Sequence, residues 1–336
     1  MEPTESVIAT RIGRIGRITL NRPRALNALD VTMIRTITAA LRGWQHEPLV
    51  HAIVIEGAGD RAFCAGGDIR AIRQFQIEGR KDAVEAFFAE EYALNLLIAT
   101  YPKPYIALVD GICMGGGIGV SVHGSYRVAS EYALFAMPET AIGFFPDIGA
   151  TYVLPRLPGF LGTYLALTGA RMQGADAVHA GLATHFVPRA ALAELSAALE
   201  RDGVAALGPR AALLPAFSLA PNRELIDAAF SADTMPEILQ RLEADGGSFA
   251  RETVATLRTM SPSSLVWSLR LLRLGADRSL EACLAAELRA TRRVTGGSEF
   301  IEGVRSMVVD KDRTPAWRPA RVEDVHRADA EAMLGN

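Results

Sequence analysis

The sequence predicts an α/β protein that ends in a helical extension. Strand-like and helix-like segments alternate up to about residue 200, which is the pattern of layered α/β folds. Beyond Pro188, alanine- and leucine-rich helical patterns replace the strands. Two glycine-rich loops also follow expected strands and precede expected helices. We therefore expect an α/β core over residues 10–200 and a helical region over residues 201–336, packed on the core.

Local patterns predict the individual elements. Residues 15–20 alternate apolar and polar side chains like a strand, and Asp30 precedes apolar residues at helical spacing, as a helix N-cap does. The β-branched run 50–57 and the apolar run 106–111 predict buried strands. Two more strands are expected at 126–130 and 133–137. Helices are expected after Asp68 and over 82–99, 118–124, about 148–154, 190–201, 223–230, 235–244, 249–260, 262–274 and 279–294.

Composition and charge narrow the protein class. Hydrophobic residues make up 49% and charged residues 22%, which is typical of a globular chain. The net charge of −3 gives no reason to expect nucleic acid or an anionic membrane as a partner. No charge-free run approaches the ~18 residues of a membrane span, and the first twenty residues lack the apolar core of a secretory signal. Three cysteines cannot all pair, so we expect a reducing compartment and a cytoplasmic protein.

Two acidic residues, Glu139 and Asp147, stand in the otherwise apolar segment 137–149. A carboxylate among apolar neighbours loses hydration, so its pKa should rise toward the range useful for acid–base or nucleophilic chemistry. A second interpretation stays open on these residues alone. In it, Asp147 caps a helix that begins at Ile148, and Glu139 pairs with a nearby arginine.

The two glycine-rich loops, residues 65–68 and 115–117, indicate close approach to a ligand. Backbone N–H groups at a helix start can bind negative charge, and two of them from separate loops would form an oxyanion hole, with donors about 3 Å from a developing alkoxide. Neither loop fits the dinucleotide or phosphate-loop pattern. The alternative is two tight turns in which glycine only permits unusual dihedral angles.

Other nucleophiles and metal ligands receive less support. Cys64 and Cys113 lie beside the glycine loops without an adjacent histidine, so we expect both to be small buried packing residues. Ser121 and His123 lack a G-x-S-x-G elbow and are expected in a helix behind the second loop. The histidines show no metal-binding spacing, so no metal site is expected.

Four segments together resemble the enoyl-CoA hydratase/isomerase (crotonase) superfamily: 21–29, 57–69, 103–117 and 137–157. Within it the chain most resembles the 3-hydroxyisobutyryl-CoA hydrolases. Two further segments carry that closer resemblance, 261–265 and 299–320, and short crotonases lack this extension. The resemblance implies a crotonase-like (ClpP/crotonase) fold of stacked β-β-α units that binds acyl-CoA.

The resemblance also implies roles for particular residues. The backbone N–H groups of Gly67 and Gly116 match the donors that hold the thioester oxygen, and Glu139 matches the acid that the superfamily commonly uses for chemistry. Hydratases carry a second glutamate three residues after the middle glycine, where this chain has Gly119, which argues against water addition to an enoyl-CoA. The hydrolases instead supply an aspartate eight residues after their glutamate, which is Asp147 here.

Glu91 matches a substrate-contacting glutamate of the hydrolases, and a solvated helix acid is its alternative. The implied reaction is hydrolysis of 3-hydroxyisobutyryl-CoA in valine breakdown, with 3-hydroxypropionyl-CoA as a second candidate substrate. It needs no cofactor beyond the coenzyme A of the substrate. Glu139 either attacks the carbonyl to give a mixed anhydride or activates water.

Two rival functions stay open, a hydratase or isomerase of the same superfamily and a non-catalytic acyl-CoA-binding protein. Quaternary structure is open as well. Crotonase relatives often form trimers or pairs of trimers, but a helical extension could cover the same surface within one chain, so a homo-oligomer and a monomer are both compatible with the sequence.

Overall fold

The computed structural model describes residues 5–208, 214–326, 328, 331 and 332, which group into two compact units. The first unit comprises Met1–Asp68, Glu90–Ala136 and Met172–Ser218. The second comprises Ile69–Ala89, Met137–Arg171 and Leu219–Asn336. Ile69–Ala89 and Met137–Arg171 precede residue 200 but group with the C-terminal helices, so both units are discontinuous in sequence.

The first unit is built on a six-stranded sheet of order β1-β2-β3-β5-β7-β10. Neighbouring strands are parallel except for the antiparallel pair β1 and β2. Strands β3 and β5 are apolar on both faces, as strands covered on both sides must be. The strands are β1 (Val7–Ile12), β2 (Ile15–Leu20), β3 (Ala52–Gly57), β5 (Tyr105–Val109), β7 (Tyr126–Ala129) and β10 (His185–Phe186).

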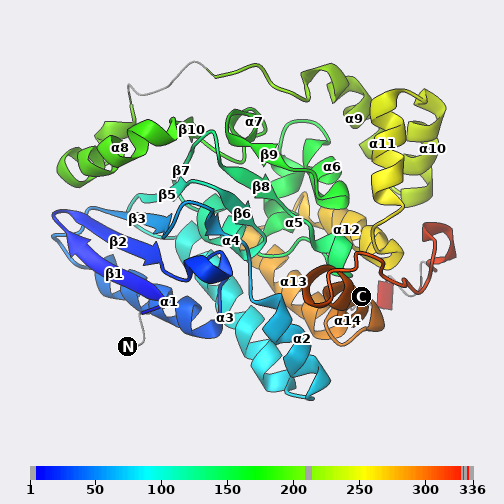
Figure 1. The fold of residues 1–336 in the computed structure, drawn as a ribbon, viewed down its shortest axis with the longest axis horizontal. Helices are drawn as coiled ribbons and strands as arrows, with labels where there is room; N and C mark the ends of the chain where they lie inside the picture. Colours follow the sequence, from blue (N-terminus) through cyan, green and yellow to red (C-terminus); the bar gives the residue numbers. More distant parts are fainter. Residues whose placement is uncertain (1–4, 209–213, 327, 329–330, 333–336) are drawn as a thin grey trace. The chain divides into compact units, whose positions relative to one another are not determined.

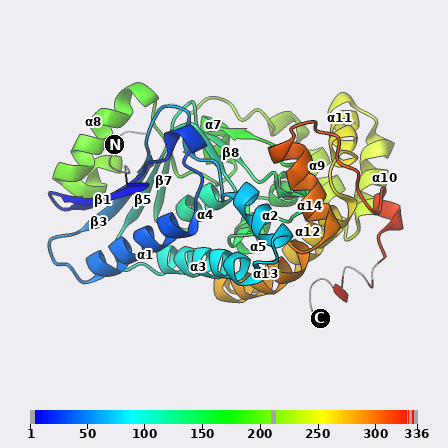
Figure 2. The same ribbon diagram turned by 60° about the horizontal axis from the view of Figure 1, so that its bottom comes forward.

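Helices cover both faces of this sheet, and the alternation along β2 shows how. Ile15 packs with Leu195 and Leu199 of α8 (Arg189–Asp202) in one apolar cluster. The next residue, Gly16, points to the other face, where a Cβ would clash with Trp44 of α1 (Val31–Gln45). Figures 1 and 2 show α8 and α1 on opposite sides of the sheet.

A second sheet of the same unit brings the two glycine loops together. Its order is β4-β6-β8-β9, with the first three strands parallel. The strands are β4 (Ala62–Cys64), β6 (Ile112–Met114), β8 (Leu134–Ala136) and β9 (Met172–Gln173). Because β4 and β6 are parallel neighbours, the loops that follow them leave the sheet at the same edge. Helix α4 (Gly116–Val122) begins within the second loop, and α7 (Gly174–His179) follows β9.

The second unit is helical. Helix α3 (Lys81–Ala99) contains the boundary between the units, and α10 and α11 lie side by side as an antiparallel pair in both ribbon views (Figures 1 and 2). The other helices are α2 (Ile69–Ile77), α5 (Ala150–Val153), α6 (Leu161–Thr168), α9 (Arg223–Phe230), α10 (Met235–Asp245), α11 (Ser248–Leu257), α12 (Pro262–Gly275), α13 (Leu280–Val294) and α14 (Ser298–Val304), with a 3-10 turn η2 (Glu139–Ile142).

The α/β class with a helical C-terminal region is confirmed, and the long periodic elements lie where the sequence places them. Asp30 caps α1, since its side chain accepts from the N–H of Met33 at 2.8 Å. The sequence reading missed short elements such as β4, β6 and α14, because three to seven residues carry too little periodicity. Helix α4 begins at Gly116 rather than at residue 118.

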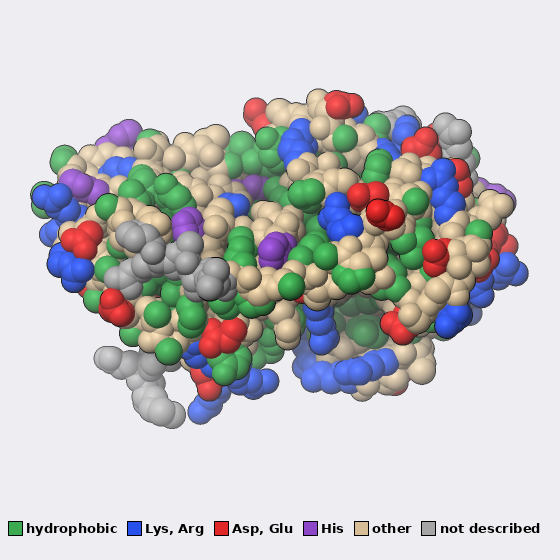
Figure 3. Space-filling view, turned by 90° about the horizontal axis from the view of Figure 1, so that it is seen from above, with side chains coloured by type: hydrophobic (Ala, Val, Ile, Leu, Met, Phe, Trp, Pro, Cys, Tyr) green, Lys and Arg blue, Asp and Glu red, His purple; other side chains and the backbone are tan. Residues whose placement is uncertain are grey.

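Among the described residues, no helix combines the length and apolarity that a membrane span needs. Basic and acidic side chains both occur across the face drawn in Figure 3.

Candidate active site

The first glycine loop is held against the chain segment that precedes α1. Residues Leu29 and Gly67 form an isolated parallel bridge, in which the Leu29 N–H donates to Gly66 and the Asp68 N–H donates to Leu29, both at 2.8 Å. Neither bond uses the N–H of Gly67. Gly66 has a φ of +110°, a conformation that side chains other than glycine rarely adopt. The loop therefore fixes Gly67 while leaving its N–H outside this bridge.

Three of the residues singled out from the sequence meet in the first unit: Gly67, Gly116 and Glu91. A Cβ built on Gly116 would clash with Oε1 of Glu91 and lie 3.2 Å from the nitrogen of Gly67. Gly116 is the first residue of α4, where backbone N–H groups have no partner within the helix. The two predicted oxyanion donors and one carboxylate thus lie around a single point.

Glu91 is 2% exposed, so the alternative of a solvated helix acid is wrong. Its neighbour Glu90 fits that description instead, with Arg35 donating two bonds to its carboxylate at 2.6 and 2.7 Å on the surface. The helical step of α3 turns adjacent acids to different environments.

The cysteines beside the glycine loops are buried packing residues. A Cβ on Gly117 would overlap the backbone of Cys64, so α4 lies directly against that cysteine. Burial raises the pKa of Cys64 to about 12 and also raises the pKa of Cys113, which opposes thiolate formation. The Ser121 hydroxyl lies 2.9 Å from the Gly117 carbonyl of its own helix, behind the glycine loop.

The acidic segment lies in the second unit, and both of its carboxylates are buried. Glu139 is 6% exposed at the start of η2, and Asp147 is 5% exposed. Between them, Phe144 stacks on Phe145 with ring centroids 4.6 Å apart and also contacts the Phe88 ring at 5.7 Å. The apolar surroundings expected for these acids are present.

The interpretation of Asp147 as a helix cap is wrong. Helix α5 begins at Ala150, and its N-cap is Gly149, which has a φ of +80°. The N–H of Gly149 donates to a carboxylate from a different part of the chain, Glu287 of α13, at 2.7 Å. A partner 138 residues away cannot be found from local sequence pattern.

The C-terminal helices hold η2 through the two segments that carry the closer resemblance. The N–H of Ser261, the N-cap of α12, donates to the Thr140 carbonyl at 3.0 Å, and its hydroxyl donates to Glu299 of α14 at 2.7 Å. Gly303 of α14 packs so closely on Ile142 that a Cβ would overlap its backbone. Burial raises the pKa of Glu299, against the bond from Ser261, which lowers it. These segments support the turn that begins with Glu139.

Comparison with known proteins places this geometry in a family. The family model described as "Enoyl-CoA hydratase/isomerase" matches residues 15–334. The chain belongs to the enoyl-CoA hydratase/isomerase family. Membership confirms the resemblance inferred from the glycine loops and the acidic segment, and it accounts for the sheets and helices of both units.

Relatives within this family are similar over nearly the whole chain. A protein of Xenopus laevis named "3-hydroxyisobutyryl-CoA hydrolase, mitochondrial" is 48% identical over 95% of this chain and 86% of its own length. The human protein of the same name is 44% identical over 98% of this chain and 88% of its own.

Solved structures of the family share the fold. One titled as a carnitinyl-CoA dehydratase from Mycobacterium thermoresistibile has a TM-score of 0.95 and 40% identity, covering 99% of this chain and 97% of its own. Another, titled as an enoyl-CoA hydratase from Rhodobacter sphaeroides, has a TM-score of 0.93 and 41% identity, covering 98% and 97%.

The expected cytoplasmic location is wrong, because the relatives named as hydrolases are mitochondrial proteins. Unpaired cysteines argue against an oxidising compartment, but they do not distinguish one reducing compartment from another.

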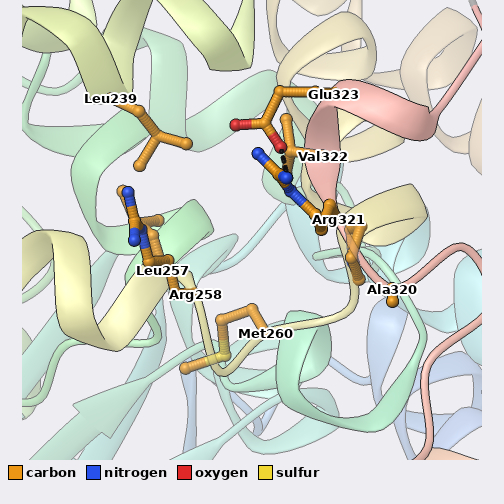
Figure 4. Close-up of a pocket in the computed structure, with 9 residues that line it drawn as sticks. Leu239, Leu257, Arg258, Met260, Ala320, Arg321, Val322 and Glu323 are labelled. Atoms are coloured by element: carbon orange, nitrogen blue, oxygen red, sulfur yellow. Dashed lines mark hydrogen bonds and ion pairs between the residues drawn. The ribbon is translucent and has the colours of Figure 1, made fainter.

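A cavity of about 430 Å³ lies elsewhere in the second unit, between α10, α11 and the segment 320–323. Figure 4 shows Leu239, Leu257 and Met260 around it, with an ion pair between Arg321 and Glu323 at 3.3 Å. None of the five residues singled out from the sequence lines this cavity. Within the described part of the chain, no group of three or more His, Cys, Asp or Glu side chains could hold a metal ion.

Proposed function

We propose that this protein hydrolyses the thioester of 3-hydroxyisobutyryl-CoA to the free hydroxy acid and coenzyme A. The observation that carries the proposal is Gly119, a glycine inside α4 at the position where hydratases of the family have their second glutamate. With no side chain there, α4 supplies no acid for water addition. The names of relatives at 44–48% identity agree with this activity.

The N–H groups of Gly67 and Gly116 are assigned to the oxyanion of the tetrahedral intermediate. Each well-placed donor of this kind contributes roughly 3–4 kcal/mol to the transition state. Both are backbone groups fixed by strand ends, so they need little reorganisation as charge develops. Glu91, buried beside Gly116, is assigned a contact with the substrate.

Glu139 is assigned the chemical step, and Asp147 orients the substrate hydroxyl or the water. Glu139 forms a mixed anhydride that water then cleaves, or it removes a proton from the attacking water; both routes use the same carboxylate. A thiolate is a good leaving group and needs little proton assistance. The proposed reaction therefore needs no cofactor, and activity should survive dialysis against a chelator.

The second candidate function is hydration or dehydration of an acyl-CoA, the activity by which the two solved structures compared above are named. A substrate panel separates the two. Purified protein is given 3-hydroxyisobutyryl-, 3-hydroxypropionyl- and 3-hydroxybutyryl-CoA, and free thiol is followed with a thiol reagent. Crotonyl-CoA hydration is followed in parallel by loss of the enoyl absorbance. Thiol release from 3-hydroxyisobutyryl-CoA is expected, whereas hydration without thiol release would overturn the proposal.

The Glu139→Gln variant separates catalysis from mere acyl-CoA binding. Removing the acid should lower kcat by about 10²–10⁴-fold, the usual contribution of a positioned acid–base or nucleophilic carboxylate. Thermal unfolding serves as the folding control, because glutamine has nearly the same shape. Equal turnover in the variant and the wild type would favour a non-catalytic acyl-CoA-binding protein.

The proposal also places the protein in valine breakdown, where the hydroxy acid product is passed on. Quaternary structure is addressed by sedimentation, which distinguishes a trimer or hexamer from a monomer.

A further inference from the structure

Glu287 is a buried carboxylate that the proposed mechanism does not use. It lies on α13 with 0% exposure, at helical spacing from the buried residues Cys283 and Ala290. A charged group is rarely placed in such an apolar stripe unless it is paired and hydrogen-bonded. Glu287 is hydrogen-bonded through both of its oxygens.

The hydrogen bonds to this carboxylate come from Gly149 and Thr151, which follow Asp147 in the sequence. Oε2 accepts from the N–H of Gly149 at 2.7 Å. Oε1 accepts from the N–H of Thr151 at 3.1 Å and from its hydroxyl at 2.5 Å. One side chain therefore holds three donors of a single short segment, and a buried donor left without its acceptor is destabilising.

The segment that Glu287 holds has an unfavourable backbone conformation. Ile148 has a φ of +56°, which is a genuine outlier for a β-branched residue, and it stands between Asp147 and Gly149. Strained backbone of this kind persists only where the surroundings fix it. On another side, Gly275 of α12 packs against the Thr151 carbonyl so closely that a Cβ would overlap it.

We infer that Glu287 is a positioning residue that fixes Asp147 by holding the backbone of residues 148–151. This inference rests on the proposed function, because it assigns Glu287 an effect on the hydrolysis through Asp147. Asp147 lies close enough to act on Glu287 electrostatically. Glutamine at position 287 would turn an NH₂ group toward some of these donors, and the segment would lose the bonds that oppose its strain.

The primary test compares wild type, Glu287→Gln, Asp147→Asn and the double variant on 3-hydroxyisobutyryl-CoA. Glu287→Gln should lower kcat by about 10–100-fold with a much smaller change in KM, since small misplacement of a reacting group costs up to about 10²-fold. If Glu287 acts through Asp147, the double variant should retain the kcat of Asp147→Asn within about two-fold, because coupled residues are non-additive. Additive losses in the double variant would overturn the inference.

A second pair of variants covers the case in which Glu287→Gln does not fold. Thr151→Ser keeps the hydroxyl that donates to Glu287 and should keep wild-type kcat, whereas Thr151→Val removes it and should lower kcat several-fold. Equal kcat in the two variants would contradict the inference.

Leu284→Ala on the same helix is the matched control for lost packing, since Leu284 is buried and makes no side-chain hydrogen bond to the segment. It should lower the melting temperature and leave kcat per folded molecule unchanged. Wild-type turnover distinguishes the two levels of failure. A wild type inactive on every thioester refutes the proposed function, whereas an active wild type with an unaffected Glu287→Gln variant refutes only the positioning role.

Discussion

The two units carry their predicted functional groups by different means. In the first unit, Gly67 and Gly116 offer backbone N–H groups after neighbouring parallel strands, so strand pairing and the bridge between Leu29 and Gly67 fix them. In the second unit, Glu139 and Asp147 offer side chains from a segment with little regular structure. Ser261 and Glu287, each more than 100 residues later, hydrogen-bond to that segment and hold it. Substitutions at the glycine loops should therefore remove catalytic groups directly. Substitutions in the C-terminal helices should instead lower activity by displacing Glu139 and Asp147.

Among changes to the main-chain scaffold of the two units, the largest effect is expected at the glycine loops. Gly116→Ala places a methyl group against the Glu91 carboxylate and 3.2 Å from the Gly67 nitrogen. We expect kcat to fall by about 10²–10³-fold, the cost of losing one oxyanion donor. Thiol release under saturating substrate measures it. Gly43→Ala on α1 is the control, because its Cβ would meet nothing within 4 Å. A similar loss of kcat in this control would contradict the assignment of Gly116 to the oxyanion hole.

An intermediate effect is expected where α14 meets η2. Gly303→Ala forces a methyl group into the backbone of Ile142, and overpacking of this kind costs about 1–3 kcal/mol. We expect lower stability in chemical denaturation, with activity falling as the turn that begins at Glu139 shifts. Full stability together with full activity would show that the C-terminal helices are not needed to hold the turn.

The smallest effect concerns pH. Burial raises the pKa of Glu287 to about 8, from 4.5 when exposed; the bonds from Thr151 and Gly149 oppose this rise, and the charge of Asp147 adds to it. Between these values the folded protein binds more protons than the unfolded chain, so the Glu287 contribution to the unfolding free energy falls as pH rises.

That contribution amounts to at most about 1.4 kcal/mol per pH unit. Denaturation of wild type and Glu287→Gln at pH 5, 6, 7 and 8 measures it. The buried thiol of Cys283 and the Asp147 carboxylate face the same region and are present in both proteins. The wild-type free energy should decline relative to the variant across this range, and parallel curves would contradict the assignment.

The sequence predicted a helix or strand correctly where the signal for it lies within a few residues. Asp30 and the apolar spacing after it predict α1 correctly, because a cap and a helical stripe are short-range signals. Asp147 shows the opposite. Its sequence position left a helix cap open as one interpretation, but the N-cap of α5 is Gly149, whose N–H donates to Glu287. The sequence does carry one signal for Glu287, because it is an acid on the apolar stripe of α13. That signal indicates a buried, hydrogen-bonded carboxylate but does not identify its hydrogen-bond partners.

The sequence by itself determined the α/β class, the helical C-terminal region, the family and the residues that carry its motifs. It could do so because hydrophobic periodicity and glycine loops are patterns that span only a few residues. Only the tertiary structure decided that Glu91 is buried against Gly116 and that Glu287 and Ser261 hold the acidic segment. These contacts join residues far apart in the chain. Their geometry depends on how whole helices and sheets pack, which no local pattern encodes.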